Sequence, residues 1–228
     1  MHNLPIHLFH LKESTMLTVH HLGKSQSERV VWLCEELAIA YELKCYERVP
    51  ATRLAPAEYK ALHPMQAAPV ITDGDLVLAE SAAVIEYIIA KYGAGRLALA
   101  PSHPDYAHYL YWFHYANGSF QAAIGRAMMV SRLDPPPDNP IWTGLQVRLE
   151  IAYGMVEARL GVAQFLAGSE FTAADIMTVF SLTTMRYFMP RDITPYPNIL
   201  AYLQRISQRE AYQRAMQKGD PGMELLLS

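Results

Sequence analysis

The chain of 228 residues lacks the features that would set it apart from an ordinary globular protein. It has only two cysteines, Cys34 and Cys45, and they form no CxxC pair. We therefore expect no disulfide framework, and a reducing compartment such as the cytoplasm. No apolar run approaches the roughly 20 residues of a membrane span. A net charge of −3 gives no electrostatic reason to expect nucleic acid or an anionic membrane as a partner.

Residues 1–15 also lack the marks of a targeting segment. They contain no long apolar core and no small-residue cleavage site, so a signal peptide is not expected. Their histidines, His2, His7 and His10, are potential metal ligands, but we expect a flexible extension and no metal. A clear strand pattern begins at Met16, which is a candidate for the original start.

What is present after Met16 is an alternation of strand and helix patterns. Residues 17–21 read as a strand in which His20 and His21 alternate between faces, a pattern that assigns them no function. A helix follows, with apolar residues at the helical spacing i, i+3, i+4 and i+7 from Val30 to Leu37. A second strand is expected over 41–49 and a loop or short helix over 54–62. This order predicts a mixed α/β sheet.

The stretch from Ala68 to Ser81 carries the most information. It predicts two short strands joined by a type I′ turn at Asp73-Gly74, followed at once by a helix with Ser81 as its N-cap. The N-terminus of a helix holds anions through its free N–H groups and the helix dipole. Such a strand end, with Glu80 beside it, is typical of a site for a small peptide-like ligand.

Strand patterns stop after Gly93. Residues 95–104 form a linker containing two prolines, and the segment from Asp105 to Arg132 predicts one long helix rich in aromatic residues. A second long helix is expected over 141–160, and Thr172 with Asp175 predicts a capping box. Two shorter helices are expected over 198–207 and 210–217. We therefore expect an α/β domain over 16–94 and a helical domain over 105–228.

The order of these elements, with five short motifs, resembles the cytosolic glutathione S-transferases over nearly the whole chain. The motifs are Ser25-Gln26-Ser27-Glu28-Arg29, His63-Pro64, Pro69, Glu80-Ser81 and the aromatic segment 109–119, the last of which, with 17–22, looks most like a bacterial and fungal branch. The resemblance implies a thioredoxin-like domain followed by an all-α domain, a homodimer, and detoxification with glutathione as co-substrate.

The resemblance also implies roles for the stretch described above. In that family the Glu-Ser pair, here Glu80 and Ser81, binds the γ-glutamyl end of glutathione. The residue before a cis-proline, here Ala68 before Pro69, pairs through its backbone with the cysteinyl unit. A basic or amide residue is often found two positions before that proline. This chain has Ala67 there, so Gln66 or Arg53 would have to contact the glycine end.

The reaction requires a thiolate, because the thiol is a poor nucleophile. Ser25 stands four residues before Arg29, as in theta-type members, and is the candidate hydroxyl donor to the sulfur. Ser27 is an alternative. The alignment of other serine and cysteine classes places the reactive position at Lys24, which cannot play the same role.

The expected reaction is the conjugation of glutathione to small, apolar electrophiles. A glutathione-dependent peroxidase on the same site and a non-catalytic ligand-binding protein are the alternatives. The aromatic segment is mostly core by its spacing, yet some of its members could wall an apolar substrate pocket. The candidates for this pocket are Tyr109, His114, Tyr115, Asn117 and Met128.

Overall fold

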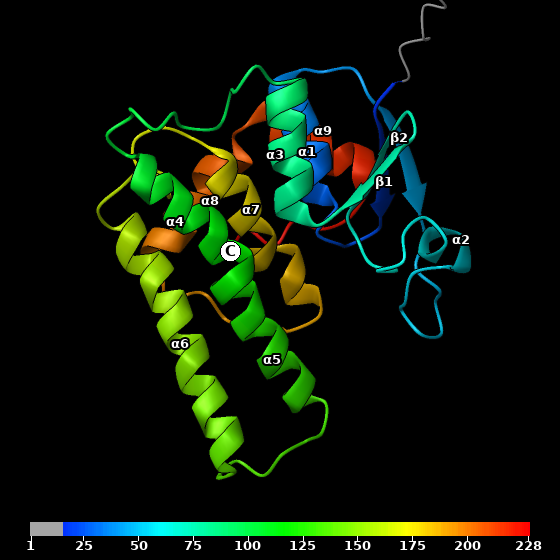
Figure 1. Ribbon diagram of the computed structural model, residues 1–228. Helices are drawn as coiled ribbons and strands as arrows, with labels where there is room; N and C mark the ends of the chain where they lie inside the picture. The colour runs from blue at the N-terminus through cyan, green and yellow to red at the C-terminus, as the bar shows by residue number, and fades with distance from the viewer. Residues whose placement is uncertain (1–15) are drawn as a thin grey trace, which may run out of the picture.

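The computed structural model describes residues 16–228, so the expectations for the first fifteen residues and their histidines lie outside the described residues. The described chain begins with strands and helices in alternation and continues with helices alone (Figure 1). The elements up to residue 91 are β1 (Thr18–Leu22), α1 (Glu28–Leu37), β2 (Glu42–Tyr46), α2 (Ala57–Lys60), β3 (Val70–Asp73), β4 (Leu76–Ala79) and α3 (Ser81–Lys91). The later elements are α4 (Tyr106–Tyr115), the π-helix η1 (Ala116–Gln121), α5 (Ala122–Ser131), α6 (Pro140–Leu160), α7 (Ala173–Leu182), the 3-10 helix η2 (Thr184–Tyr187), α8 (Pro197–Ser207) and α9 (Glu210–Gly219).

The four strands form one mixed sheet in the order β2-β1-β3-β4. β1 runs parallel to β2 and antiparallel to β3, so Val19 lies opposite Leu43 on one side and Ile71 on the other. The predicted apolar face of α1 is buried, and Leu33 and Leu37 join the main core with Val19. A smaller apolar cluster lies around Tyr59 of α2. The mixed α/β sheet predicted from the order of elements is therefore confirmed.

The hairpin between β3 and β4 forms, but its turn lies one residue later than predicted. Asp73 pairs with Leu76 in the ladder, which makes Gly74 and Asp75 the two turn residues. Gly74 has a φ of 61°, whereas Asp75 is not in the left-handed region, so the turn requires one positive φ and not the two of a type I′ turn. Asp73 is withdrawn from the turn because its carboxylate accepts hydrogen bonds from Tyr87, Lys91 and Tyr92.

The start of α3 also differs from the prediction. Ser81 is the first helical residue, not the N-cap, and its hydroxyl makes no capping bond. The N-cap position belongs to Glu80, which has a φ of 73°. Non-glycine residues with such a φ are uncommon and cluster at functional sites, because the left-handed region crowds the side chain. The local strain at Glu80 therefore marks this helix start as more than a structural cap.

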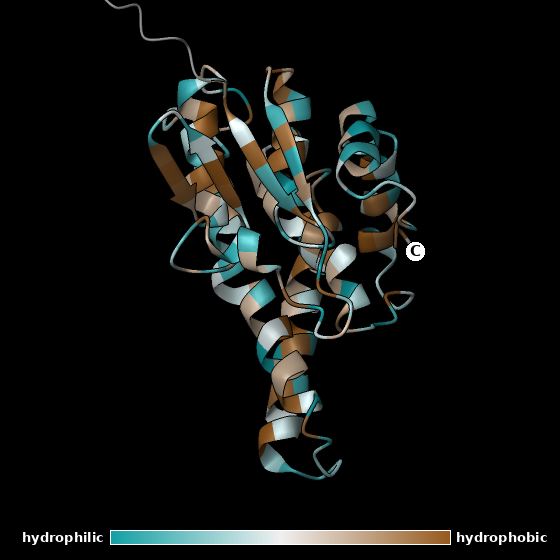
Figure 2. Cartoon of the chain, turned by 90° about the vertical axis from the view of Figure 1, so that its right-hand side faces the viewer, coloured by the Kyte–Doolittle hydropathy of each residue, from teal (hydrophilic) through white to brown (hydrophobic). Residues whose placement is uncertain are grey.

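The single long helix predicted over 105–132 is divided into α4, η1 and α5. The π-helical turn at 116–121 interrupts an otherwise continuous helix, a feature often found at functional sites. α5 and α6 then run side by side beyond the rest of the molecule to the loop that joins them (Figures 1 and 2). The proline at N1 of α6 follows Asn139, whose side chain caps the helix.

The buried helix α7 begins with the predicted capping box. The backbone N–H of Thr172 donates to the carboxylate of Asp175 at 2.9 Å, and Ala174 donates to the hydroxyl of Thr172 at 3.3 Å. Asp175 also accepts hydrogen bonds from the N–H of Leu166 and the hydroxyl of Tyr202. Complete burial raises the pKa of Asp175 to about 6. Its structural role, expected from the sequence, is confirmed.

Candidate functional site

Two adjoining hollows lie where the sheet meets the helical part of the chain. One is lined by Glu80 and Ser81 and the other, of about 320 Å³, by Ser25. Four residues line both hollows, namely Gln26, Ala67, Ala68 and Gln121. We call the continuous depression the groove, with a Glu80 end and a Ser25 end.

The wall shared by the two ends is the segment before β3. The Ala68–Pro69 peptide is cis, and the backbone N–H and C=O of Ala68 make no hydrogen bond with the described residues. Gln66 has a φ of 53° and borders the Ser25 end. Three non-glycine residues in the left-handed region, Lys24, Gln66 and Glu80, thus line the groove. This concentration of strained backbone is typical of a ligand-binding site.

At the Glu80 end, the carboxylate of Glu80 is exposed and has no hydrogen bond or ion pair with the described residues. Ser81 is 1% exposed, and its hydroxyl donates to Oε1 of Gln26 at 3.0 Å. Behind Ser81 lies the guanidinium of Arg29, which donates to the hydroxyl of Ser81 at 3.3 Å. This end therefore offers a free carboxylate, a hydroxyl and a helix N-terminus to a ligand.

From the sequence, Arg29 had no role beyond locating Ser25 four residues before it, yet Arg29 is the centre of the polar network beneath the groove. It is fully buried and donates to the side-chain oxygens of Gln26, Asn117 and Gln121 at 2.8–2.9 Å. None of these partners carries a charge, and burial lowers the pKa of Arg29 to about 9. A positive charge without a carboxylate partner lies directly behind Ser81, which favours an anionic group at this end.

The π-helical turn explains how the helical part reaches Arg29. Asn117 and Gln121 are four residues apart in η1, and both side chains accept from the guanidinium. Asn117 was predicted to line the substrate pocket and instead borders the Glu80 end. No sequence signal marks the π-turn. A charged residue within the apolar pattern of the helix after residue 27 is the one signal that could have singled out Arg29.

At the Ser25 end, a hydroxyl lies before the first helix. Ser25 is 5% exposed, and its Oγ lies 2.7 Å from Oγ of Ser27, which is fully buried. Ser27 is the N-cap residue of α1 but makes no capping bond with its side chain. Its Oγ lies 3.0 Å from Nδ1 of His21. Of the two serines, only Ser25 lines the groove.

The Ser25 end also has an apolar wall. This wall includes Leu54, Met128, Phe180, Met185 and Phe188. Met128 is the one predicted substrate-pocket residue among them. Tyr109 is buried in the core, the hydroxyl of buried Tyr115 donates to Ala152 of α6, and His114 is exposed. None of these three lines the groove.

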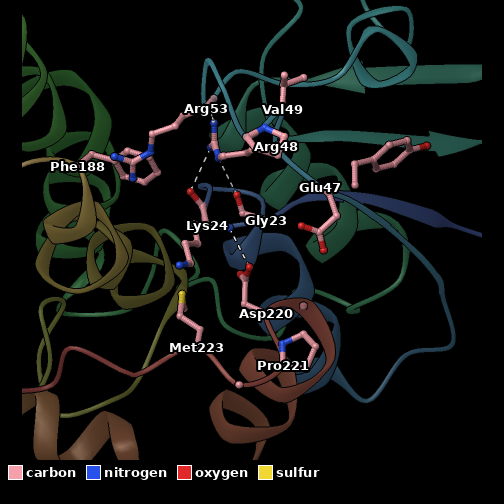
Figure 3. Close-up of a pocket in the computed structure, with 14 residues that line it drawn as sticks. Gly23, Lys24, Glu47, Arg48, Val49, Arg53, Phe188, Asp220, Pro221 and Met223 are labelled. Atoms are coloured by element: carbon pink, nitrogen blue, oxygen red, sulfur yellow. Dashed lines mark hydrogen bonds between the residues drawn. The ribbon is translucent and has the colours of Figure 1, made fainter.

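A third hollow adjoins the Ser25 end, and Figure 3 shows its lining. Arg48 donates hydrogen bonds to the carbonyls of Gly23, Lys24 and Arg53, which fixes the loop before Ser25 against the loop after β2. Arg53, predicted to contact glutathione, stacks on Phe188 with its guanidinium carbon 5.1 Å from the ring centroid. It borders this hollow and not the groove itself.

The described residues contain no group of three or more histidine, cysteine or acidic side chains placed to hold a metal ion. In the same part of the chain, no helix has the length and apolar character needed to cross a membrane. Both cysteines are free thiols. Burial of Cys34 raises the pKa of its thiol, as expected for a core residue.

Comparison with known proteins identifies the family. Residues 25–91 match the glutathione S-transferase N-terminal domain and residues 145–210 match the C-terminal domain. Glutathione S-transferase 3 of Schizosaccharomyces pombe is 30% identical over 93% of this chain and 92% of its own length. A glutathione S-transferase structure from Actinobacillus pleuropneumoniae is 33% identical, with a TM-score of 0.83, over 92% of this chain and 95% of that one.

A more distant structure, a glutathione transferase family member from Pseudomonas fluorescens with two glutathione bound, is 19% identical with a TM-score of 0.74. It covers 90% of this chain and 94% of that one, and at this identity it supports the fold alone. The prediction of a thioredoxin-like domain followed by a helical one is confirmed. The chain belongs to the glutathione S-transferase family.

Proposed function

We propose that the chain is a glutathione transferase that binds glutathione along the groove and transfers its thiolate to small, largely apolar electrophiles. The reaction class in this proposal rests on membership of the family. The observation that supports this use of the groove is that its Glu80 end and its Ser25 end share one wall at Ala68. A single extended tripeptide can therefore reach both ends.

In this proposal the γ-glutamyl unit occupies the Glu80 end. Its α-ammonium pairs with the free carboxylate of Glu80, and its α-carboxylate lies on Ser81 and the N-terminus of α3. The buried charge of Arg29 adds to the attraction for the carboxylate. The cysteinyl unit pairs with the backbone of Ala68, whose N–H and C=O are free to bond it.

The sulfur then lies at the Ser25 end, where Ser25 is the hydroxyl that favours the thiolate. A free thiol has a pKa of about 8.5, and lowering it by about 2 units requires about 2.7 kcal/mol. A hydroxyl together with a helix N-terminus can supply energy of that order. The glycine end lies toward Gln66, and an apolar electrophile contacts Met128 and Phe188.

The experiment that tests this proposal is a conjugation assay with a generic aromatic electrophile, run on the wild type and Ser25→Ala. We expect turnover in the wild type and a loss of at least about 10-fold in kcat/KM for the variant. Turnover that survives the substitution would move the role to Ser27 or a backbone N–H. No turnover in the wild type, with no rise in Tm on adding glutathione, would contradict the transferase assignment.

We also propose that the active form is a homodimer in the cytoplasm. Helix α6 exposes apolar side chains one turn apart at Val147, Ile151 and Met155, with exposed fractions of 58%, 50% and 38%. A second copy that covers this stripe would remove it from water. Ile151→Glu should shift the sedimentation of the protein toward a monomer, whereas Val162→Glu, which lies beyond the helix, should not.

A further inference from the structure

The hydroxyl of Ser25 is the first member of a buried hydrogen-bonded chain that leaves the groove. It continues from Oγ of Ser25 to Oγ of Ser27 at 2.7 Å, and from there to Nδ1 of His21 at 3.0 Å. The other ring nitrogen of His21, Nε2, lies 3.0 Å from Oδ2 of Asp220. Ser27 and His21 are completely buried, and the side chain of Asp220 is 8% exposed.

Asp220 fixes the direction of every bond in the resting chain. A carboxylate only accepts, so Nε2 of His21 carries the hydrogen and Nδ1 of the neutral ring is an acceptor. Ser27 then donates its hydrogen to Nδ1 and accepts from the N–H of Leu22, at 3.1 Å, and from the hydroxyl of Ser25. Ser25 accepts from the N–H of Ser27 at 3.3 Å, which leaves it one acceptor site for a ligand in the groove that it lines.

In this state Ser25 can accept a hydrogen bond from a thiol but cannot donate one to a thiolate. The chain must reverse to do so. If Nδ1 of His21 gains a proton, it donates to Ser27, Ser27 donates to Ser25, and Ser25 donates its hydrogen into the groove. Protonation of His21 and stabilisation of a thiolate at Ser25 are therefore two ends of one rearrangement.

The position of Asp220 suits it for this role. It follows α9 and lies next to the loop before Ser25, where its second oxygen accepts the backbone N–H of Lys24 at 2.9 Å (Figure 3). A side chain at Gly219 would approach Nε2 of His21 to 3.1 Å, so the ring is held closely on this side as well. One carboxylate thus holds both the histidine and the loop that carries Ser25.

The charged and titratable groups around this pair come from three elements. Glu28 of α1 is fully buried beside Asp220, and burial raises the pKa of Glu28 to about 8. Cys45 of β2 lies opposite His21 in the ladder, and burial together with the charge of Asp220 raises the pKa of its thiol. Arg48, after β2, is the cation whose charge acts on Asp220. Asp220 is the member of this group that contacts His21 directly.

We propose that Ser25, Ser27, His21 and Asp220 form a proton relay that transfers the proton of the glutathione thiol to His21. The S–H bond breaks, each serine passes on one hydrogen and receives another, and a new N–H bond forms at Nδ1. The sulfur keeps the electron pair that attacks the electrophile. In an addition reaction the proton returns to the adduct, and in a substitution it leaves to solvent.

This proposal rests on the proposed role of Ser25. His21 and Asp220 act on the sulfur only through the two serines, so they are positioning residues. Asp220→Asn retains the size of the side chain but presents an N–H₂ group to Nε2, which favours the tautomer with hydrogen on Nδ1 and removes the proton acceptor. Ser27→Ala interrupts the chain at its middle without touching the histidine–aspartate pair.

The experiment is an ultraviolet titration of the thiolate of bound glutathione against pH, on full-length protein saturated with glutathione. The apparent pKa of the bound thiol should rise by about 1 unit in Asp220→Asn and in Ser27→Ala. kcat/KM at neutral pH should fall about 10-fold and return to the wild-type level at alkaline pH, where the thiol ionises unaided. The control is His20→Gln, since His20 lies on the opposite face of β1, bonded to Tyr46 and Thr72.

The outcomes separate the relay from the role of Ser25. If Ser25→Ala raises the pKa of the bound thiol while Asp220→Asn and Ser27→Ala bind glutathione and leave it unchanged, the relay is wrong and Ser25 acts alone. If Ser25→Ala also leaves it unchanged, the role of Ser25 is wrong and the relay falls with it. A change in Tm or KM alone would indicate a structural role and would likewise overturn the relay.

Discussion

Two neighbouring residues of α1, Glu28 and Arg29, carry opposite charges when ionised, and both are buried next to the groove or the chain behind it. At the Glu80 end, Arg29 brings a buried positive charge to neutral amide oxygens, and its pKa falls to about 9. Outside the groove, Glu28 is buried against the hydroxyl of Thr184, 2.6 Å away, and burial raises the pKa of Glu28 to about 8. The Glu80 end therefore combines the buried charge of Arg29 with the exposed carboxylate of Glu80, whereas Ser25 begins a chain of neutral hydroxyls that leads through His21 to the carboxylate of Asp220.

Glutathione binding and thiol ionisation are thus assigned to different ends of the groove. The Glu80 end presents charges that match a ligand before it arrives, so it is suited to affinity. The Ser25 end presents hydrogen bonds whose direction can reverse, so it is suited to proton movement. A substitution at one end should therefore leave the other property unchanged.

The largest effect is expected from Arg29→Met. The substitution removes the hydrogen bonds that the buried guanidinium donates to the half-buried side chains of Gln26, Asn117 and Gln121, so the free energy of unfolding should fall by about 1 to 3 kcal/mol. Glutathione affinity should fall as well, because Ser81 loses its support. Urea unfolding measures the first effect, with Arg148→Met on the exposed face of α6 as control. Equal urea midpoints for both variants would contradict the role given to Arg29.

A pH effect of intermediate size is expected from Glu28. Its pKa is raised on folding from 4.5 to about 8, so the folded state binds the extra proton. The associated stability is complete at low pH and is lost as the pH rises through about 8. Tm of the wild type should therefore fall as the pH rises from about 4.5 to about 8 and level off above that, and Glu28→Gln should flatten that fall. Glu86→Gln, an exposed site on α3, should behave like the wild type.

The smallest effect is expected from the apolar wall. Met128→Ala shortens an apolar side chain that lines the Ser25 end. KM for an apolar electrophile should rise by roughly 3-fold to 10-fold, while Kd for glutathione stays unchanged. The adjacent Met129, which is 59% exposed, supplies the matched control Met129→Ala. A change in glutathione affinity would show that the two ligands do not occupy separate parts of the groove.

Much of the fold could be predicted because its signals are local. Periodic apolar residues specify α1, and the capping residues Thr172 and Asp175 specify the start of α7. The predictions that differed did so where tertiary hydrogen bonds compete with local ones. Ser81 does not cap α3 because its hydroxyl bonds to Gln26, and the turn is displaced because Asp73 bonds to α3 and the residue after it.

The candidate site likewise has a part that depends on residues close in sequence and a part that depends on residues far apart. The Glu80 end could be anticipated because Ala68, Glu80 and Ser81 lie within fourteen consecutive residues. The chain behind Ser25 could not, because Asp220 is 199 positions from His21 and no pattern in a strand distinguishes a buried histidine with such a partner. The π-turn at 116–121 gave no sequence signal either, and its contact with Arg29 joins residues 88 positions apart in the chain.

The separation of binding from ionisation is tested most directly by one titration of bound glutathione that yields both Kd and the pKa of the thiol. For Glu80→Gln this separation predicts a Kd raised by at least about 10-fold with the pKa of the thiol unchanged. For Ser25→Ala it predicts a pKa raised by about 1 unit or more, with Kd at low pH within about 2-fold of the wild type. If either variant shifts both quantities together, the two ends of the groove do not act separately and the account is contradicted.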